Sequence, residues 1–146
     1  MSKRQALPFS TTLRVRDTCL CLHVQRAARA LARRFDEALR PVNLTSGQFS
    51  LLMSLNRPEH ARIGEVAALL GMDRTTLTAA LKPLERRGLV RVTIDEADKR
   101  GRRLVLAPAG RSALVAAMPL WEQTEAAIER LVGDADRLRG DLRALC

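Results

Sequence analysis

Apolar residues recur along most of this chain at steps of three and four, which is the repeat of a helix with one buried face. The first such run spans residues 17–40 and ends before Pro41, because the residue before a proline is pushed out of the α region. Residues 1–16 lack this repeat and are expected to form an irregular arm. Thr45 and Gln48 have the spacing of a capping box, which predicts that a second helix begins there.

Two short helices joined by a glycine-containing turn are predicted over residues 63–87, and this is the sequence form of a helix-turn-helix. The first helix closes at Gly71, and Asp73 is a good N-cap for the second, which continues to Gly88. Pro83 lies inside the second helix and is expected to bend or loosen it, because proline removes one backbone donor.

After this helix pair the apolar repeat changes from helical to alternating. Residues 89–94 and 103–106 are rich in β-branched and apolar side chains, and a charged segment containing a glycine separates them. Residues 89–106 are therefore predicted to form a β-hairpin, or wing, with a charged tip. The fold expected from these patterns is mainly α with a small β-hairpin wing, a winged helix-turn-helix over residues 45–107.

Helical periodicity returns over residues 108–146, with a bend expected at Pro119 and a break at Gly133 before a last short helix. The apolar stripes of residues 17–40 and of this C-terminal region, including Trp121, exceed what a winged-helix unit covers. An apolar stripe without a partner in its own chain is usually an interface. These two regions are therefore predicted to be dimerisation helices of a single-domain protomer, and the alternative is a monomer that folds its tail onto its head.

The charge of the chain adds the expectation of an anionic partner. Lysine and arginine number 25 against 16 acidic residues, a net charge of +9, and residues 82–103 hold eight basic but only four acidic side chains. No apolar run approaches the roughly 18 residues of a membrane helix, and the start of the chain lacks the apolar centre of a signal peptide. Three cysteines fit a reducing compartment, so a cytoplasmic protein is expected.

The predicted helix-turn-helix and wing carry side chains that suit double-stranded DNA. The second helix of such a pair fits the major groove, where arginine forks onto guanine and threonine bonds phosphates or touches a thymine methyl group. Basic side chains on the wing suit the narrow, negative minor groove. The candidate DNA-binding residues are Arg74, Thr75, Thr76, Thr78 and Lys82 on the helix, and Lys99, Arg100, Arg102 and Arg103 on the wing.

Four stretches of the chain have residue patterns that are typical of a known protein family: 63–78, 84–90, 98–100 and 104–110. They resemble the MarR family of bacterial winged-helix regulators, and the resemblance covers nearly the whole chain, although Ala107 replaces a threonine that is usual in the family. The resemblance implies an obligate homodimer whose first and last helices interlock and whose wings straddle a short pseudo-palindrome. It also implies that Arg100 enters the minor groove, that Asp98 orients this arginine, and that a small aromatic ligand, often a phenolic acid, binds near the dimer helices.

The cysteines raise the question of a signal. The stretch from Cys21 to Thr45 is similar to the organic-hydroperoxide-sensing branch of the family, whose peroxidatic cysteine matches Cys21. A thiolate near a helix N-terminus is favoured by the helix dipole, so Cys21, with Cys19, is a candidate for sensing an oxidant or another thiol-reactive effector. The same branch surrounds its cysteine with tyrosines, but the matching positions of this chain hold Gln25, Phe35 and Ser46. The absence of these tyrosines argues against peroxide sensing here.

Neither a metal nor a cofactor is expected. Cys19 and Cys21 would point about 200° apart on a regular helix, and His23 and His60 form no ligand cluster with them in the sequence. The main hypothesis is a dimeric transcriptional repressor that is not an enzyme. Two alternatives stay open: a thiol-based, peroxide-reacting enzyme with Cys21 as its nucleophile, and a basic protein that binds nucleic acid without sequence specificity.

Overall fold

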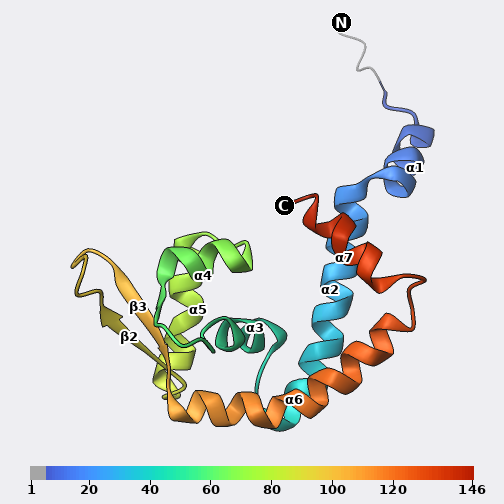
Figure 1. Cartoon of the computed structure of the whole chain (residues 1–146). Helices are drawn as coiled ribbons and strands as arrows, with labels where there is room; N and C mark the ends of the chain where they lie inside the picture. Colours follow the sequence, from blue (N-terminus) through green and yellow to red (C-terminus); the bar gives the residue numbers. More distant parts are fainter. Residues whose placement is uncertain (1–5) are drawn as a thin grey trace, which may run out of the picture.

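The computed structural model describes residues 6–146, and Figure 1 shows them as two groups of elements, with the long helix α6 running from one group to the other. On one side lie α3, α4, α5 and the β2–β3 hairpin, which we call the winged-helix part. On the other side lie α1, α2 and α7, which we call the arm helices. The elements in chain order are α1 (Phe9–Thr18), α2 (Leu20–Leu39), the 3-10 turn η1 (Arg40–Val42), α3 (Ser46–Ser54), β1 (Ala61–Arg62), α4 (Ile63–Leu70), α5 (Arg74–Arg86), β2 (Val90–Ile94), β3 (Arg102–Leu106), α6 (Pro108–Glu129) and α7 (Ala135–Arg143).

The helix starts and stops of the winged-helix part confirm the signals in the sequence. The Thr45 hydroxyl accepts a hydrogen bond from the Gln48 N–H, and the Gln48 side chain accepts one from the Thr45 N–H, so the capping box forms at the start of α3. Gly71 ends α4 in the left-handed conformation with φ of 64°. The Asp73 carboxylate caps α5. Helix α5 continues through Pro83 to Arg86, so the expected disturbance does not break it.

The sheet has three antiparallel strands in the order β1–β3–β2, which confirms the hairpin and adds one strand. In the hairpin, Val92 pairs with Leu104. On the other side of β3, Ala61 pairs with the same Leu104. The short strand β1 was not predicted from the sequence, because two residues carry no periodicity and their extended form depends on β3. It connects the hairpin directly to the start of α4.

The core lies where the winged-helix part packs against α2 and α6. Leu39 at the end of α2, Leu52 of α3 and Leu77 of α5 are fully buried in one continuous cluster. Trp121 of α6 stacks on Phe49 of α3, with ring centroids 6.3 Å apart. The expectation that Trp121 belongs to an uncovered stripe was therefore wrong, since its ring has a partner in its own chain.

The N-terminal region differs from the expected irregular arm. Residues 1–5 lie outside the described residues, but Phe9–Thr18 form the helix α1, so the prediction was wrong for this part. Cys19 adopts an extended conformation between α1 and α2, and α2 begins at Leu20 rather than near residue 17. Helix α1 has no buried residue, which explains why the sequence shows no apolar repeat there.

Helix α6 runs from Pro108 to Glu129 and changes direction along its length in Figure 1, in agreement with the bend expected at Pro119. Asp134 accepts a hydrogen bond from the Arg137 N–H and caps α7, as the break in the sequence indicated. None of the helices within residues 6–146 has the length and apolar character needed to cross a membrane.

Candidate nucleic-acid interface

The turn between α4 and α5 is held by Asp73. Its carboxylate accepts hydrogen bonds from the N–H and the hydroxyl of Thr76, at 2.7 and 2.8 Å. These bonds hold the pKa of Asp73 below its ordinary value, although burial alone would raise it. Thr76 was predicted to contact DNA, but the structure places its hydroxyl on this cap. Thr76 therefore fixes the start of α5.

One side of α5 presents polar and basic side chains to solvent. Arg74, Thr75, Thr78 and Lys82 are exposed and line one shallow hollow together with Ala79. They lie within about 100° of one another around the helix axis, so they share a helix face, while Leu77 and Leu81 on the neighbouring face are buried. This face gathers four of the five residues that the sequence predicted on this helix.

Gly64 makes room for Arg74. A Cβ atom built on Gly64 would lie 2.8 Å from a terminal nitrogen of the Arg74 guanidinium, so the guanidinium passes directly over the first turn of α4. Any larger residue at position 64 would displace the arginine. The glycine of α4 thus leaves room for the first basic side chain of α5.

The tip of the wing is a tight turn that displays two basic residues. The Gly101 N–H donates to the Asp98 carbonyl at 2.8 Å, and the Asp98 carboxylate accepts from the Arg100 N–H at 3.1 Å. The Asp98 carboxylate therefore holds the backbone of Arg100 in the turn. The side chains of Lys99 and Arg100 are exposed. Arg102, also exposed, folds its guanidinium back onto the carbonyl of Gly101 at 3.1 Å.

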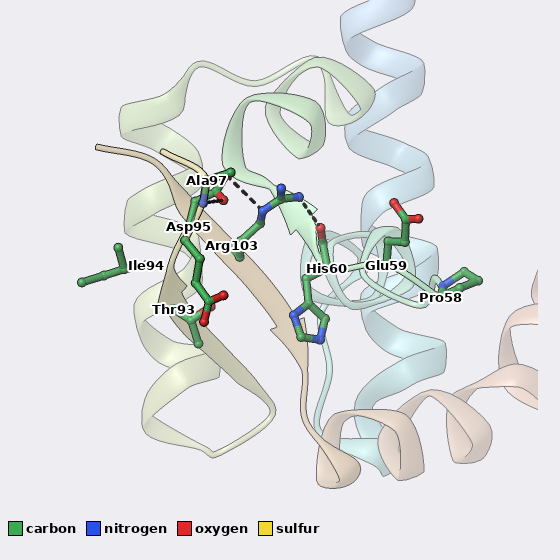
Figure 2. Close-up of a pocket in the computed structure, with 9 residues that line it drawn as sticks. Pro58, Glu59, His60, Thr93, Ile94, Asp95, Ala97 and Arg103 are labelled. Carbon is green, nitrogen blue, oxygen red and sulfur yellow. Dashed lines mark hydrogen bonds and ion pairs between the residues drawn. The ribbon is translucent and has the colours of Figure 1, made fainter. Parts of the chain in front are cut away.

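The base of the wing contains a buried carboxylate that sequence reasoning missed. Asp95 is only 4% exposed, and its carboxylate pairs with Arg103 of β3 at 3.1 Å and with Arg62 of β1 at 3.3 Å. Arg103 also donates to the His60 carbonyl at 2.9 Å, so it reaches from the hairpin to the segment before β1, as Figure 2 shows. We call Asp95, Arg62 and Arg103 the wing-base cluster.

The wing-base cluster changes the role expected for one predicted DNA-binding residue. Arg103 is occupied by Asp95 and His60 at the base of the hairpin, away from the tip. Burial opposes ionisation of Asp95, but the Ala97 N–H and the guanidinium groups of Arg103 and Arg62 lower its pKa below the ordinary value. The sequence signal for this residue was an aspartate opening the charged loop, where its carboxylate accepts from the N–H two residues on.

The three cysteines lie near the two ends of the chain, at the arm helices, and outside the winged-helix part. Cys19 occupies the N-cap position of α2 without a capping bond from its side chain, and the exposed Cys21 accepts a hydrogen bond at its Sγ atom from the Gln25 side-chain amide, 3.2 Å away. All three cysteines are free thiols, and the Cys146 thiol donates to the Leu142 carbonyl at 3.6 Å. Within residues 6–146 no group of three potential ligands is placed to hold a metal ion.

Apolar side chains remain uncovered on the arm helices. Helices α1 and α7 bury no residue, and Leu20 and Leu145 are 70% and 62% exposed. Other apolar residues of α1, α2 and α7 are also exposed, by 38–71%: Phe9, Val15, Val24, Leu31, Leu138 and Leu142. Apolar side chains of the arm helices are thus exposed to solvent in the described chain.

The order of α4, turn, α5 and antiparallel hairpin around one core defines a winged helix-turn-helix protein. Known proteins share both this fold and much of the sequence. A sequence model described as the MarR family matches residues 44–101. The structure of the M. tuberculosis transcriptional regulator MosR in complex with DNA is 42% identical, with 87% of this chain and 92% of that chain covered and a TM-score of 0.81. This chain belongs to the MarR family of transcriptional regulators.

Two further relatives show how far the similarity extends. The repressor CouR bound to a 23-mer DNA duplex is 31% identical, with 90% of this chain and 92% of CouR covered and a TM-score of 0.74. The regulator TtmR of Methylorubrum extorquens is 36% identical over 95 residues, which are 65% of this chain and 49% of TtmR. The matched part thus spans about half the length of TtmR.

Proposed function

We propose that this chain is a homodimeric, sequence-specific DNA-binding regulator of transcription, a cytoplasmic repressor rather than an enzyme. The observation that carries the proposal is the pairing of an uncovered basic face on α5 with a basic tip on the adjacent hairpin, both built on one core. In this proposal residues 45–107 form the DNA-binding region, with the helix-turn-helix at 63–87 and the wing at 89–106. Residues 17–40 and 108–146 form the dimerisation region.

Helix α5 supplies the contacts to the major groove. Its exposed side places Arg74 at the N-terminal end and Lys82 about two turns later. An arginine at the start of such a helix is suited to the paired acceptors of guanine, and threonine hydroxyls are suited to phosphates. Thr75 and Thr78 lie on the same face between them. Thr76 and Asp73 then act as positioning residues, because their hydrogen bonds fix where α5 begins.

The wing supplies the contact to the minor groove. Arg100 and Lys99 extend from a turn that Asp98 holds through backbone hydrogen bonds, and their side chains are exposed. A narrow minor groove concentrates negative potential and attracts such side chains. Because Asp95 ties the base of the hairpin to β1, which leads directly into α4, the wing tip keeps a fixed position relative to the helix-turn-helix.

Dimerisation follows from the uncovered arm helices. Apolar side chains on α1, the first half of α2 and α7 have no cover within residues 6–146, and a two-fold axis would bury the same surface on both copies. Two copies place two α5 helices on one face, as required for a pseudo-palindromic operator whose half-sites are about one DNA turn apart.

Two effector classes are proposed to release the DNA. A thiol-reactive oxidant is supported by Cys21, which is exposed and has its Sγ atom held by Gln25. A small aromatic ligand is supported by a groove between α2 and α6, which Arg33 and Arg34 line beside Leu120 and Ile128. The relative CouR has also been solved with p-coumaroyl-CoA bound. Measuring DNA affinity with peroxide and with a panel of aromatic acids separates the two classes.

The decisive experiment compares DNA binding by wild type and Arg100→Ala. Fluorescence anisotropy with an operator duplex selected from random sequence is expected to show nanomolar affinity that falls steeply with salt. Arg100→Ala is expected to weaken binding about tenfold or more while the protein stays dimeric. Arg29→Ala removes another exposed arginine, on α2, and serves as the control for the loss of one positive charge.

Three outcomes would count against the proposal. Equal affinity for unrelated sequences at physiological salt would favour the non-specific nucleic-acid-binding alternative. Unchanged affinity of Arg100→Ala would remove the wing from the mechanism. Continuous turnover of a hydroperoxide with a dithiol reductant, lost in Cys21→Ser, would favour the thiol enzyme.

A further inference from the structure

Helix α7 is tied to α6 by a single arginine. Within the described part of the chain, every salt bridge between these two helices involves Arg139. Its guanidinium donates to Glu125 Oε1 at 3.0 Å and to Glu129 of α6, and also to Asp136 Oδ1 of α7 at 2.7 Å. We call these four residues the α6–α7 clamp. No other side chain of the arm helices holds three carboxylates.

The clamp matters because little else fixes α7. This helix is nine residues long and buries none of them, and a short segment around Gly133 separates it from α6. A helix of this length is marginal without tertiary support. The acceptors on Glu129 and then Glu125 raise the pKa of Arg139 above its usual range, although burial alone would lower it.

The side of α7 next to the clamp carries an apolar row. Leu138 and Leu142 are four residues apart and share one face of α7, about 60–100° around the helix from Arg139, and Leu145 follows just beyond the end of the helix at Arg143. All three are exposed, by 42%, 40% and 62%. Fixing Arg139 on α6 therefore also fixes the direction in which this row points.

A second copy of this chain fits the row. Leu20 and Val24 at the start of α2 are exposed as well, and Figure 1 places α7 and this end of α2 at the same end of the molecule. Each copy thus offers two apolar faces, which a two-fold axis would bring together as one isologous interface. A phosphate-bearing or otherwise polar partner would leave both faces uncovered.

We propose that Arg139 is a positioning residue for dimerisation. It fixes the angle between α6 and α7 before association, so that Leu138, Leu142 and Leu145 already face the second copy when the two chains meet. This inference rests on the proposed function and names the residue that orients one face of the proposed dimer interface. Preorganisation lowers the ordering cost of association. Without the guanidinium, Glu125, Glu129 and Asp136 would repel one another and drive α7 away from α6.

The test compares Arg139→Gln with Arg143→Gln by sedimentation velocity over a range of concentrations. Arg143 lies on the same helix, is exposed, and makes no side-chain ion pair in the described structure, so it is a matched control for charge. Arg139→Gln is expected to raise the dissociation constant of the dimer about tenfold, and Arg143→Gln to change it less than about twofold. Arg139→Lys is expected to restore part of the affinity, because lysine keeps the charge without the planar fork.

A second arm separates positioning from a general loss of stability. Circular dichroism at one concentration, at which both proteins have the same oligomeric state by sedimentation, is expected to show the same unfolding midpoint for wild type and Arg139→Gln, since α7 contributes no residue to the core cluster. Replacing both Glu125 and Glu129 by glutamine should weaken the dimer, and adding Arg139→Gln to that variant should have little further effect.

The outcomes distinguish this inference from the proposed function. A wild-type chain that stays monomeric at all concentrations would overturn the dimeric regulator itself. A dimeric wild type with an unchanged dissociation constant in Arg139→Gln would overturn only the role of Arg139. Equal weakening by Arg143→Gln, or fully additive effects with the glutamate variants, would also overturn it, because charge rather than the clamp would then be responsible.

Discussion

Gly110 is the position where the backbone of α6 touches the base of the wing most closely. A Cβ atom built there would lie 2.2 Å from the Leu89 carbonyl oxygen and 2.8 Å from Leu106 Cδ1. The Leu106 side chain can turn aside, but the Leu89 carbonyl already accepts the Ala107 N–H at 3.0 Å. Gly110→Ala must therefore move the backbone of α6 or of Leu89, by roughly 1 Å for an ordinary carbon–oxygen contact.

The magnitude follows from three opposing contributions. Alanine gains about 0.5–1 kcal/mol over glycine inside a helix. Overpacking against a fixed backbone costs about 1–3 kcal/mol. Weakening the buried bond between Ala107 and Leu89 adds about 1–3 kcal/mol. We therefore expect Gly110→Ala to lower the free energy of unfolding by about 2–4 kcal/mol.

Urea unfolding followed by circular dichroism at one fixed protein concentration measures this difference. Gly47→Ala is the matched control, because Gly47 lies in the first turn of α3 and a Cβ atom there would have no neighbour within 4 Å. This variant is expected to match wild type or to gain up to about 1 kcal/mol. If Gly110→Ala were as stable as wild type, the close approach of α6 to the wing base would be refuted.

Two further predictions concern charge and the thiol. Because the pKa of Asp95 is lowered in the folded chain, its stabilising contribution is full well above the ordinary value of 3.8 and is lost as the pH falls below it. Asp95→Asn should reduce the loss of unfolding free energy between pH 5 and pH 3, and it should weaken operator binding at neutral pH because the base of the wing loses its ion pairs. If the unfolding free energy of Asp95→Asn fell with acid as steeply as that of wild type, the wing-base cluster would not be the cause of this loss. If a thiol-reactive signal acts at Cys21, a stoichiometric amount of hydroperoxide should release wild type from DNA but leave Cys21→Ser bound, as followed by anisotropy. Release of both proteins would assign the signal to another group.

Local signals in the sequence predicted the elements that depend on neighbouring residues. The capping box at Thr45, the glycine at Gly71 and the cap at Asp73 each act within four residues, and the structure has all three in place. The alternation in the hairpin and the helical stripes are likewise local patterns. These were sufficient to indicate a winged helix-turn-helix and the exposed face of α5.

The features that the sequence did not reveal depend on residues far apart in the chain. The strand β1 exists only because Ala61 pairs with Leu104. Asp95 was counted as one more loop charge, since its burial requires Arg62 from a segment more than thirty residues earlier. Trp121 was assigned to an open stripe because its partner Phe49 belongs to a different helix. In each case the missing information was a tertiary contact rather than a residue type.

Helix α6 connects the proposed DNA interface with the proposed dimer interface. Its first turn lies against the wing base through Gly110, and its last turns hold α7 through Arg139. Its 22 residues span about 33 Å if straight, and the helix also packs on α2 and α3. The middle of the helix is fixed to α3 by the stacking of Trp121 on Phe49.

A packed helix of this kind moves as a unit, because close-packed interiors shift between discrete arrangements rather than deform continuously. A signal that changes how two copies pack at the arm helices must therefore change the direction of α6, and with it the separation of the two α5 helices. Operator half-sites have a fixed spacing, so even a small change in that separation lowers the affinity for DNA. In the proposed dimer, a signal at Cys21 or in the groove between α2 and α6 could thus release the operator without any contact between the effector and the proposed DNA-binding residues.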